Sequence, residues 1–250
     1  PRGKVNPEVD WLLANDLPIR HIRGVVLANE LLDAMPVHRV VGHADGVKEL
    51  GVGISETGAL TSVFLDDVNP ALGDRFTSLG VTLAVGHRSE VNLDIGRWMH
   101  SLANALDSGY VLVVDYGHDA ADYYNAARSR GTLRCYYQHT MNMDPYSHVG
   151  RQDIGAHVEF TSVRREAELA GFSVSSDTNQ ADLLRKLGFE AHRMHVESRN
   201  GLRKAVQTAN LAAMDELVDP EALGAFRALT LRKGVESPDI TGVPASPSVN

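Results

Sequence analysis

The sequence has a single cysteine, no long apolar run and no cluster of positive charge, and each shortage argues against a class of protein. Cys135 has no partner for an intramolecular disulfide, which fits a reducing compartment, and we expect it to be a small buried side chain. No apolar run approaches the roughly 20 residues of a membrane span. The first 17 residues contain no signal-peptide core. We therefore expect a protein of the cytoplasm without a membrane span.

Basic residues are fewer than acidic ones, 24 against 32, and the formal net charge is −8. Binding to nucleic acid needs clustered Lys and Arg to contact phosphates, and here these residues are scattered along the sequence. Nucleic acid is therefore not an expected partner. With 250 residues, 43% of them hydrophobic, the chain is long enough for one α/β domain of ordinary size.

Two short apolar runs end abruptly in polar residues. The first, residues 22–28, stops at Asn29 and Glu30, and the second, residues 109–114, stops at Asp115. Apolar runs of this length are typical of strands that are buried on both faces of a parallel sheet. Because ligands bind at the carboxyl ends of such strands, the polar side chains that follow them are candidates for chemistry.

Between these two strands the hydrophobic period changes to two. Residues 37–67 contain three alternating stretches separated by Asp-Gly and Thr-Gly pairs, whose glycines supply the positive φ of tight hairpins. We therefore predict an antiparallel meander inserted beside the parallel sheet. The other predicted elements are a helical segment over 6–17, a short helix within 66–86, helices over 89–106, 162–170, 180–187 and 201–217, and strands over 172–174 and 226–231.

A polar and aromatic segment, residues 115–160, follows the second strand. It is too long for a simple connection, and long ordered loops in compact domains are usually functional. One interpretation is a metal-dependent hydrolase, although a compact motif such as two histidines one helical turn apart is missing. The side chains that such a site would use are those of His139, Asp144, His148, Asp153 and His157.

Four segments occur in a fixed order that is more specific than any one of them. They are residues 28–39 (ANELLDAMPVHR), 88–93 (RSEVNL), 113–117 (VVDYG) with Tyr123 and Tyr124, and 131–139 (GTLRCYYQH) continuing to Asp144, Pro145, Gly150, Asp153, Ile154 and 157–160 (HVEF). Together they resemble the MidA-like S-adenosylmethionine-dependent methyltransferases, bacterial relatives of a mitochondrial complex I assembly methyltransferase. Gly155 stands where that family usually has threonine, and Glu159 where it usually has aspartate.

The resemblance implies an α/β fold, a Rossmann-like class I methyltransferase sheet, with the strand ending at Asn29 as its fourth strand. The family's glycine-rich loop after the first strand, which holds the cofactor, has no counterpart here. About three βα units, on the order of 100 residues, would then lie upstream, and the start at Pro1 fits a processed or partial chain. We expect residues 1–234 to be the C-terminal part of the methyltransferase domain, 37–67 its inserted meander, and 235–250 a disordered tail.

The same resemblance implies S-adenosylmethionine as cofactor and a protein as substrate, with the methyl group going to an arginine, for example on a respiratory complex subunit. Methyl transfer depends mainly on binding and orientation, and carboxylates can hold a guanidinium through bidentate hydrogen bonds. Glu30 and Asp33 are the catalytic residues that we expect to hold it. His139, Asp153 and His157 are candidates for substrate binding or proton removal.

On the cofactor side, Asn29, Asp115 and Tyr116 are the expected contacts, with Tyr116 as a cation–π partner. Structural alternatives are that Asp33 caps its turn, that Asp115 binds backbone amides, and that both histidines are hydrogen-bonded structural residues. For Glu30 the functional interpretation is favoured, because a carboxylate in the crevice needs a partner. The alternative to an enzyme is a non-catalytic assembly or interaction protein of the same fold. The sequence leaves open whether the protein forms a homodimer.

Overall fold

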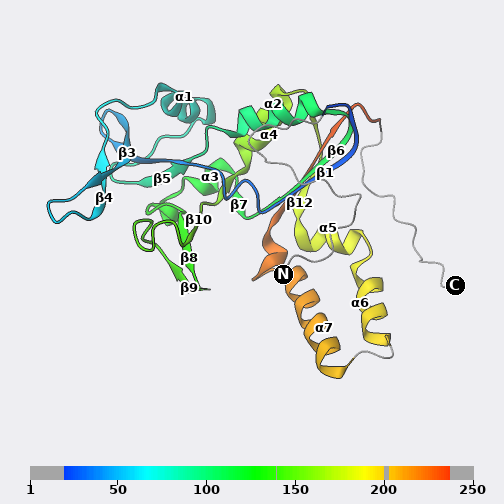
Figure 1. Ribbon diagram of the computed structural model, residues 1–250. Coiled ribbons are helices and arrows are strands. Elements are labelled where there is room, and N and C mark those ends of the chain that lie inside the picture. The colour runs from blue at the N-terminus through cyan, green and yellow to red at the C-terminus, as the bar shows by residue number, and fades with distance from the viewer. Residues whose placement is uncertain (1–19, 139, 200–202, 237–250) are drawn as a thin grey trace.

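The computed structural model describes residues 20–138, 140–199 and 203–236 (Figure 1). The predicted helical segment over 6–17, the candidate His139 and residues 237–250 of the predicted tail lie outside these ranges. Within them, none of the helices is long and apolar enough to cross a membrane.

The main sheet has four strands, and two of them run parallel. Their order is β1 (Ile22–Asn29), β6 (Leu106–Asp115), β13 (Arg227–Lys233) and β12 (Ser173–Asn179). β1 is parallel to β6, and β13 is antiparallel to both β6 and β12. The carboxyl ends of β1 and β6 therefore meet at one edge. The amino end of β13 lies there too, because Arg227 pairs with Asp115.

Two helices, α2 (Ile95–Ala105) and α4 (Phe160–Leu169), cover one face of this sheet. Val111 and Val113 of β6 belong to the core that these helices form, whereas Val114 packs with Leu183 of α5 (Gln180–Lys186) on the other face. This alternation follows from the two-residue period of a strand. β6 is thus buried on both faces, as its apolar run predicts.

β1 departs from that prediction. Val26 and Ala28 pack against the core, but Val25 and Leu27 are 60% and 67% exposed. β1 is the edge strand of the sheet, and at Val25 and Leu27 no part of the chain within the described ranges covers its second face. Burial on both faces is therefore wrong for β1.

A second four-stranded sheet contains three consecutive antiparallel strands from the segment between β1 and β6. Its order is β4 (Leu60–Phe64), β3 (Gly46–Ile54), β2 (His38–His43) and β5 (Arg88–Val91), and α1 (Pro70–Leu79) packs beside it through Leu72 and Phe76. β5 falls where a helix over 89–106 was predicted. That prediction is wrong at its start, because residues 88–91 pair with β2 and the helix begins only at Ile95.

Short elements bridge the two sheets and follow them. They are β7 (Gly117–His118) paired with β11 (Val158–Glu159), α3 (Ala120–Tyr123), η1 (Ala126–Arg128), and a small sheet of β10 (Asp153–Gly155), β8 (Arg134–Tyr137) and β9 (Thr140–Asn142). Toward the C-terminus lie α6 (Phe189–Ser198), which was not predicted, α7 (Lys204–Val218) and η2 (Leu223–Ala225). Figure 1 shows α6 and α7 side by side, extending away from the main sheet.

Candidate functional site

The chain leaves β1 through a strained and exposed turn. Glu30 has a φ of 46°, a left-handed conformation that non-glycine residues rarely adopt, and its N–H donates to the Val114 carbonyl at 2.9 Å. The Asn29 side-chain amide donates to Glu30 Oε1 at 3.2 Å, and both residues are exposed. Strain of this kind is concentrated at functional sites. The Glu30 carboxylate is therefore open to a ligand at the carboxyl edge of the sheet.

Asp115, at the end of β6, is fully buried and holds the turn that follows β1. Its Oδ2 accepts hydrogen bonds from the N–H groups of Leu32 at 3.0 Å and Asp33 at 3.2 Å, and its Oδ1 accepts one from Tyr116 at 2.9 Å. Burial, followed by the charge of Asp33, raises the pKa of Asp115 to about 7. This geometry supports the structural alternative, in which Asp115 binds backbone amides.

Asp33 and Tyr116 form a side-chain pair at the same edge. The Tyr116 hydroxyl donates a hydrogen bond to Asp33 Oδ2, and Gly155 lies so close that an added Cβ would sit 2.8 Å from that hydroxyl. Asp33 Oδ1 is buried and has no hydrogen-bond partner among the described residues. A buried acceptor without a donor is costly, so this oxygen is suited to receive a donor from a ligand.

His157 lies against Tyr116 and is neutral near pH 7. Its ring makes an edge contact with Tyr116 at 5.2 Å between centroids, and burial, then the neighbouring His118, lowers the pKa of His157 to about 4. Arg128 donates to His118 Nδ1 at 3.4 Å, so neutral His118 carries its hydrogen on Nε2 and donates to His157 Nδ1 at 3.2 Å. His157 is therefore a weak proton acceptor whose ring packs against Tyr116.

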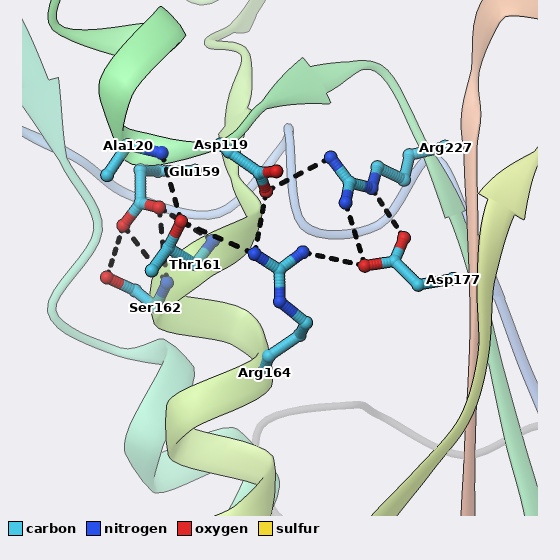
Figure 2. A network of polar contacts seen from close by, with 8 residues as sticks. All are labelled: Asp119, Ala120, Glu159, Thr161, Ser162, Arg164, Asp177 and Arg227. Carbon is cyan, nitrogen blue, oxygen red and sulfur yellow. Dashed lines mark hydrogen bonds and ion pairs between the residues drawn. The ribbon is translucent and has the colours of Figure 1, made fainter.

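Four charged residues anchor the segment after β6 to the rest of the sheet (Figure 2). Arg227 binds Asp177 through two hydrogen bonds of 2.6 and 2.7 Å and reaches Asp119 at 3.0 Å. Arg164 of α4 binds the same two carboxylates, at 2.7 Å to Asp177 and 2.8 Å to Asp119. The alternating charges lower the pKa of Asp177 despite its partial burial. The network joins α4, β12 and β13 to the start of α3.

Beside this network, Glu159 caps the N-terminus of α4. Its carboxylate accepts from the N–H groups of Thr161 at 2.7 Å and Ser162 at 3.1 Å, and from the Ser162 hydroxyl (Figure 2). The Thr161 hydroxyl in turn accepts from the Ala120 N–H at 3.0 Å. β11 and the start of α4 are thereby fixed beside β7, and His157, which precedes β11, is fixed with them.

Of the polar side chains that were considered for a metal, three in the described ranges have other partners. His148 stacks on Tyr137 at 4.0 Å, Asp144 accepts from the Tyr146 N–H at 2.9 Å, and His157 bonds to His118. Over residues 20–138, 140–199 and 203–236, no three His, Cys, Asp or Glu side chains could share a metal ion.

Most of the predicted site residues meet at the carboxyl edge. Asn29, Glu30 and Asp33 come from the end of β1, and Asp115 and Tyr116 from the end of β6. His157 joins them through its contact with Tyr116.

Three residues of the site were not among those predicted from the sequence. His118 and Arg128 set the tautomer of His157, and the Thr132 hydroxyl accepts from the His157 N–H at 3.2 Å. His118 follows the polar strand end by three residues and could have been noticed for that reason. The other two are brought in by long-range contacts that leave no local pattern.

Comparison with known proteins gives consistent matches. A family model described as "Putative S-adenosyl-L-methionine-dependent methyltransferase" matches residues 3–177. Among curated proteins, the mitochondrial protein arginine methyltransferase NDUFAF7 of Danio rerio is 26% identical over 204 residues, which are 80% of this chain and 45% of that protein. The Homo sapiens protein of the same name is 28% identical over 202 residues, 79% of this chain and 42% of that protein.

Solved structures agree with these sequence matches. A crystal structure from Burkholderia thailandensis, bound to S-adenosyl-homocysteine, has a TM-score of 0.79 and 29% identity, and covers 91% of this chain and 57% of that one. A second structure from the same organism has a TM-score of 0.80 and 28% identity, with 91% and 59% covered. The chain thus spans less than half the length of these curated relatives and less than two thirds of these structures.

Proposed function

The chain belongs to this family of S-adenosyl-L-methionine-dependent methyltransferases, and we propose that its carboxyl edge is the acceptor side of a site that methylates a protein arginine. The observation that carries the proposal is a pair of carboxylates at that edge, Glu30 exposed and Asp33 with a buried oxygen lacking a donor among the described residues. A guanidinium offers five N–H donors in a planar fork that matches carboxylates. The names of the NDUFAF7 relatives, protein arginine methyltransferases, support the same acceptor.

The described residues would act by binding and orientation. Glu30 and Asp33 hold the guanidinium, and the Tyr116 hydroxyl fixes the Asp33 carboxylate by donating to it. Asp115 keeps the turn that carries Asp33 in place, and neutral His157 packs against the Tyr116 ring. A guanidinium held between carboxylates is oriented so that one nitrogen can face the methyl donor.

When bound, S-adenosylmethionine supplies an electrophilic methyl group. The edge residues fit part of this cofactor, because exposed Asn29 offers an amide and the electron-rich ring of Tyr116 suits a positively charged sulfonium. No strand in the described ranges is followed by a glycine-rich loop and a helix. We propose that further strands of the natural-length protein, beyond these 250 residues, pair with the open edge of β1 and supply that loop, as the greater length of the relatives allows.

Calorimetric titration with S-adenosylmethionine tests the enzymatic function. The gene product at its natural length should release heat on binding, and cells that carry the gene should contain methylarginine on a protein that cells without it lack. Mass spectrometry of that protein, a respiratory complex subunit or another, would identify the acceptor. A natural-length protein that does not bind S-adenosylmethionine would instead be the non-catalytic assembly protein.

A further inference from the structure

Three arginine side chains meet in one cavity that the proposed function leaves without a role. The cavity has a volume of about 240 Å³, enough for a ligand group of several heavy atoms. It lies beside the second sheet and the segment after η1. Its walls are formed by Arg39, Arg88, Glu90, Arg130, Leu133 and Met143.

Strand register explains why these arginines converge although they are scattered in the sequence. β2 and β5 are antiparallel, with Arg39 opposite Glu90. Because side chains two residues apart share a face of a strand, Arg88 lies on the same face as Glu90 and Arg39. Arg130 is brought to this face by a parallel bridge to Arg88.

Positive charge exceeds negative charge on the cavity walls. Arg39 donates to two neutral hydroxyl groups, Ser62 Oγ at 3.0 Å and Tyr146 Oη at 3.1 Å. Within the described part of the chain, the side chains of Arg88 and Arg130 make no hydrogen bond or ion pair. In a protein of net charge −8, this local excess of guanidinium groups is a distinct feature.

Glu90 does not neutralise this charge, because it is already bound by the protein. Its side chain is buried, and its Oε2 accepts from the N–H and the hydroxyl of Thr132 at 2.7 and 3.0 Å. Burial raises the pKa of Glu90, and Arg39 opposes that shift only in part. Thr132 also accepts from the His157 N–H, so this one residue connects the cavity with the acceptor site.

The rim of the cavity is apolar and exposed. Met143 is 51% exposed, and the nearby sheet of β8 and β9 exposes Tyr136 and Met141, which pair with each other. A free inorganic anion has no apolar groups that could pack against such a rim. A cationic pocket bordered by apolar side chains is suited to an acidic side chain carried by a polypeptide.

We propose that this pocket binds the carboxylate of an aspartate or glutamate in the acceptor protein, close to the arginine that is methylated. The proposal rests on the proposed function, because it takes the acceptor to be a protein. Guanidinium groups bind carboxylates in bidentate pairs, so Arg88 and Arg130 provide most of the recognition. The pocket then selects acceptors in which an acidic residue accompanies the arginine.

Peptide binding to the 250-residue chain tests this assignment without any need for cofactor or turnover. A blocked tetraglutamate peptide, titrated by calorimetry at low salt, should bind, and a blocked tetraglutamine peptide should not. The double variant Arg88→Gln/Arg130→Gln should bind tetraglutamate at least about tenfold more weakly. The matched control is Arg97→Gln, which removes an arginine with 77% side-chain exposure from α2 and should leave binding unchanged.

A second variant distinguishes a loss of the binding site from a loss of folding. Met143→Glu places a negative charge on the exposed rim and should also weaken tetraglutamate binding while the thermal midpoint stays within about 2 °C. Tetraglutamate binding that is absent, or equal in the parent and the double variant, would overturn the assignment. So would inorganic phosphate that displaces the peptide and binds tenfold more tightly. Because no step involves Glu30 or methyl transfer, a failure here is distinct from a failure of the proposed function.

Discussion

The two parallel strands of the main sheet end at the same edge with opposite chemistry. At the end of β6, Asp115 is fully buried, and its carboxylate accepts three backbone N–H groups. At the end of β1, Glu30 is exposed and Asp33 has a buried oxygen without a donor among the described residues. A carboxylate that the fold itself satisfies contributes to stability. One that the fold leaves unsatisfied at this edge is suited to a ligand.

Removing the satisfied carboxylate should have the largest effect. Asp115→Ala leaves the N–H groups of Leu32, Asp33 and Tyr116 without an acceptor, and each buried unsatisfied donor costs about 1–3 kcal/mol. The free energy of unfolding, measured by urea denaturation, should therefore fall by about 3 kcal/mol or more. A loss below about 1 kcal/mol would mean that Asp115 does not hold this turn.

The second largest loss of stability should come from breaking the charged network of Arg164, Arg227, Asp119 and Asp177. Arg227→Gln removes the bidentate contact to Asp177 and the contact to Asp119, and should lower the free energy of unfolding by about 2 kcal/mol. Arg97→Gln is the matched control, because its ion pair with Asp94 is exposed and contributes less than about 0.5 kcal/mol. Equal effects of the two substitutions would contradict the anchoring role.

The dependence of stability on pH should show opposite contributions from two groups at this edge. Burial raises the pKa of Asp115 from 3.8 to about 7, so its contribution is full below 3.8 and is lost as the pH rises through 7. Burial lowers the pKa of His157 from 6.5 to about 4, so its contribution is full above 6.5 and is lost as the pH falls through 4. The two contributions oppose each other between these limits.

The two contributions therefore cancel between pH 4 and 6.5, and above pH 6.5 that of Asp115 alone lowers stability, by about 1.4 kcal/mol per pH unit, until about pH 7. His118 and His87, whose pKa values burial also lowers from 6.5, make stability fall as the pH drops below 6.5, so stability should be greatest near pH 6.5. Urea denaturation from pH 5 to 8 measures this profile. In His157→Gln the decline below pH 6.5 should become shallower, and an unchanged acidic limb would refute the burial of a neutral His157.

The smallest expected effect on stability concerns the close packing at Gly155. An alanine there places its Cβ 2.8 Å from the Tyr116 hydroxyl and 3.2 Å from Asp33 Oδ2, so the tyrosine must shift. Stability should change by less than about 1 kcal/mol, while methyl transfer falls about two- to tenfold because Asp33 loses its orientation. Gly73→Ala in α1, where an added Cβ meets nothing within 4 Å, should leave activity unchanged and serves as control.

Much of the fold followed from local sequence patterns, and the departures have long-range causes. The alternating and apolar runs predicted β1, β6 and the strands of residues 38–64 close to where they lie. Residues 89–91 were assigned to a helix because their pattern continues into α2, yet pairing with β2 makes them part of a strand, residues 88–91. The exposed face of β1 could not be anticipated, because exposure depends on what covers a strand and not on its own residues.

In the candidate site, too, some features were predictable from local sequence and others depend on long-range contacts. That polar residues at the ends of two strands would gather at one edge was predictable from the rule for parallel sheets. Which carboxylate would be saturated by backbone N–H groups was not, because Asp115 and Asp33 lie 82 residues apart in the sequence. The convergence of Arg39, Arg88 and Arg130 likewise depends on strand register, so a sequence with scattered basic residues still forms a cationic pocket.

Methyl transfer by a Glu30→Gln variant of the natural-length protein tests the central claim most directly. The substitution keeps the size of the side chain and an oxygen for the Asn29 amide, but it removes the charge that would hold a guanidinium. We predict at least about 100-fold less methylarginine by mass spectrometry, equivalent to about 2.7 kcal/mol, with S-adenosylmethionine binding and the free energy of unfolding unchanged within about 0.5 kcal/mol. Near-normal methylation by this variant would contradict the assignment of the β1 end as the acceptor side.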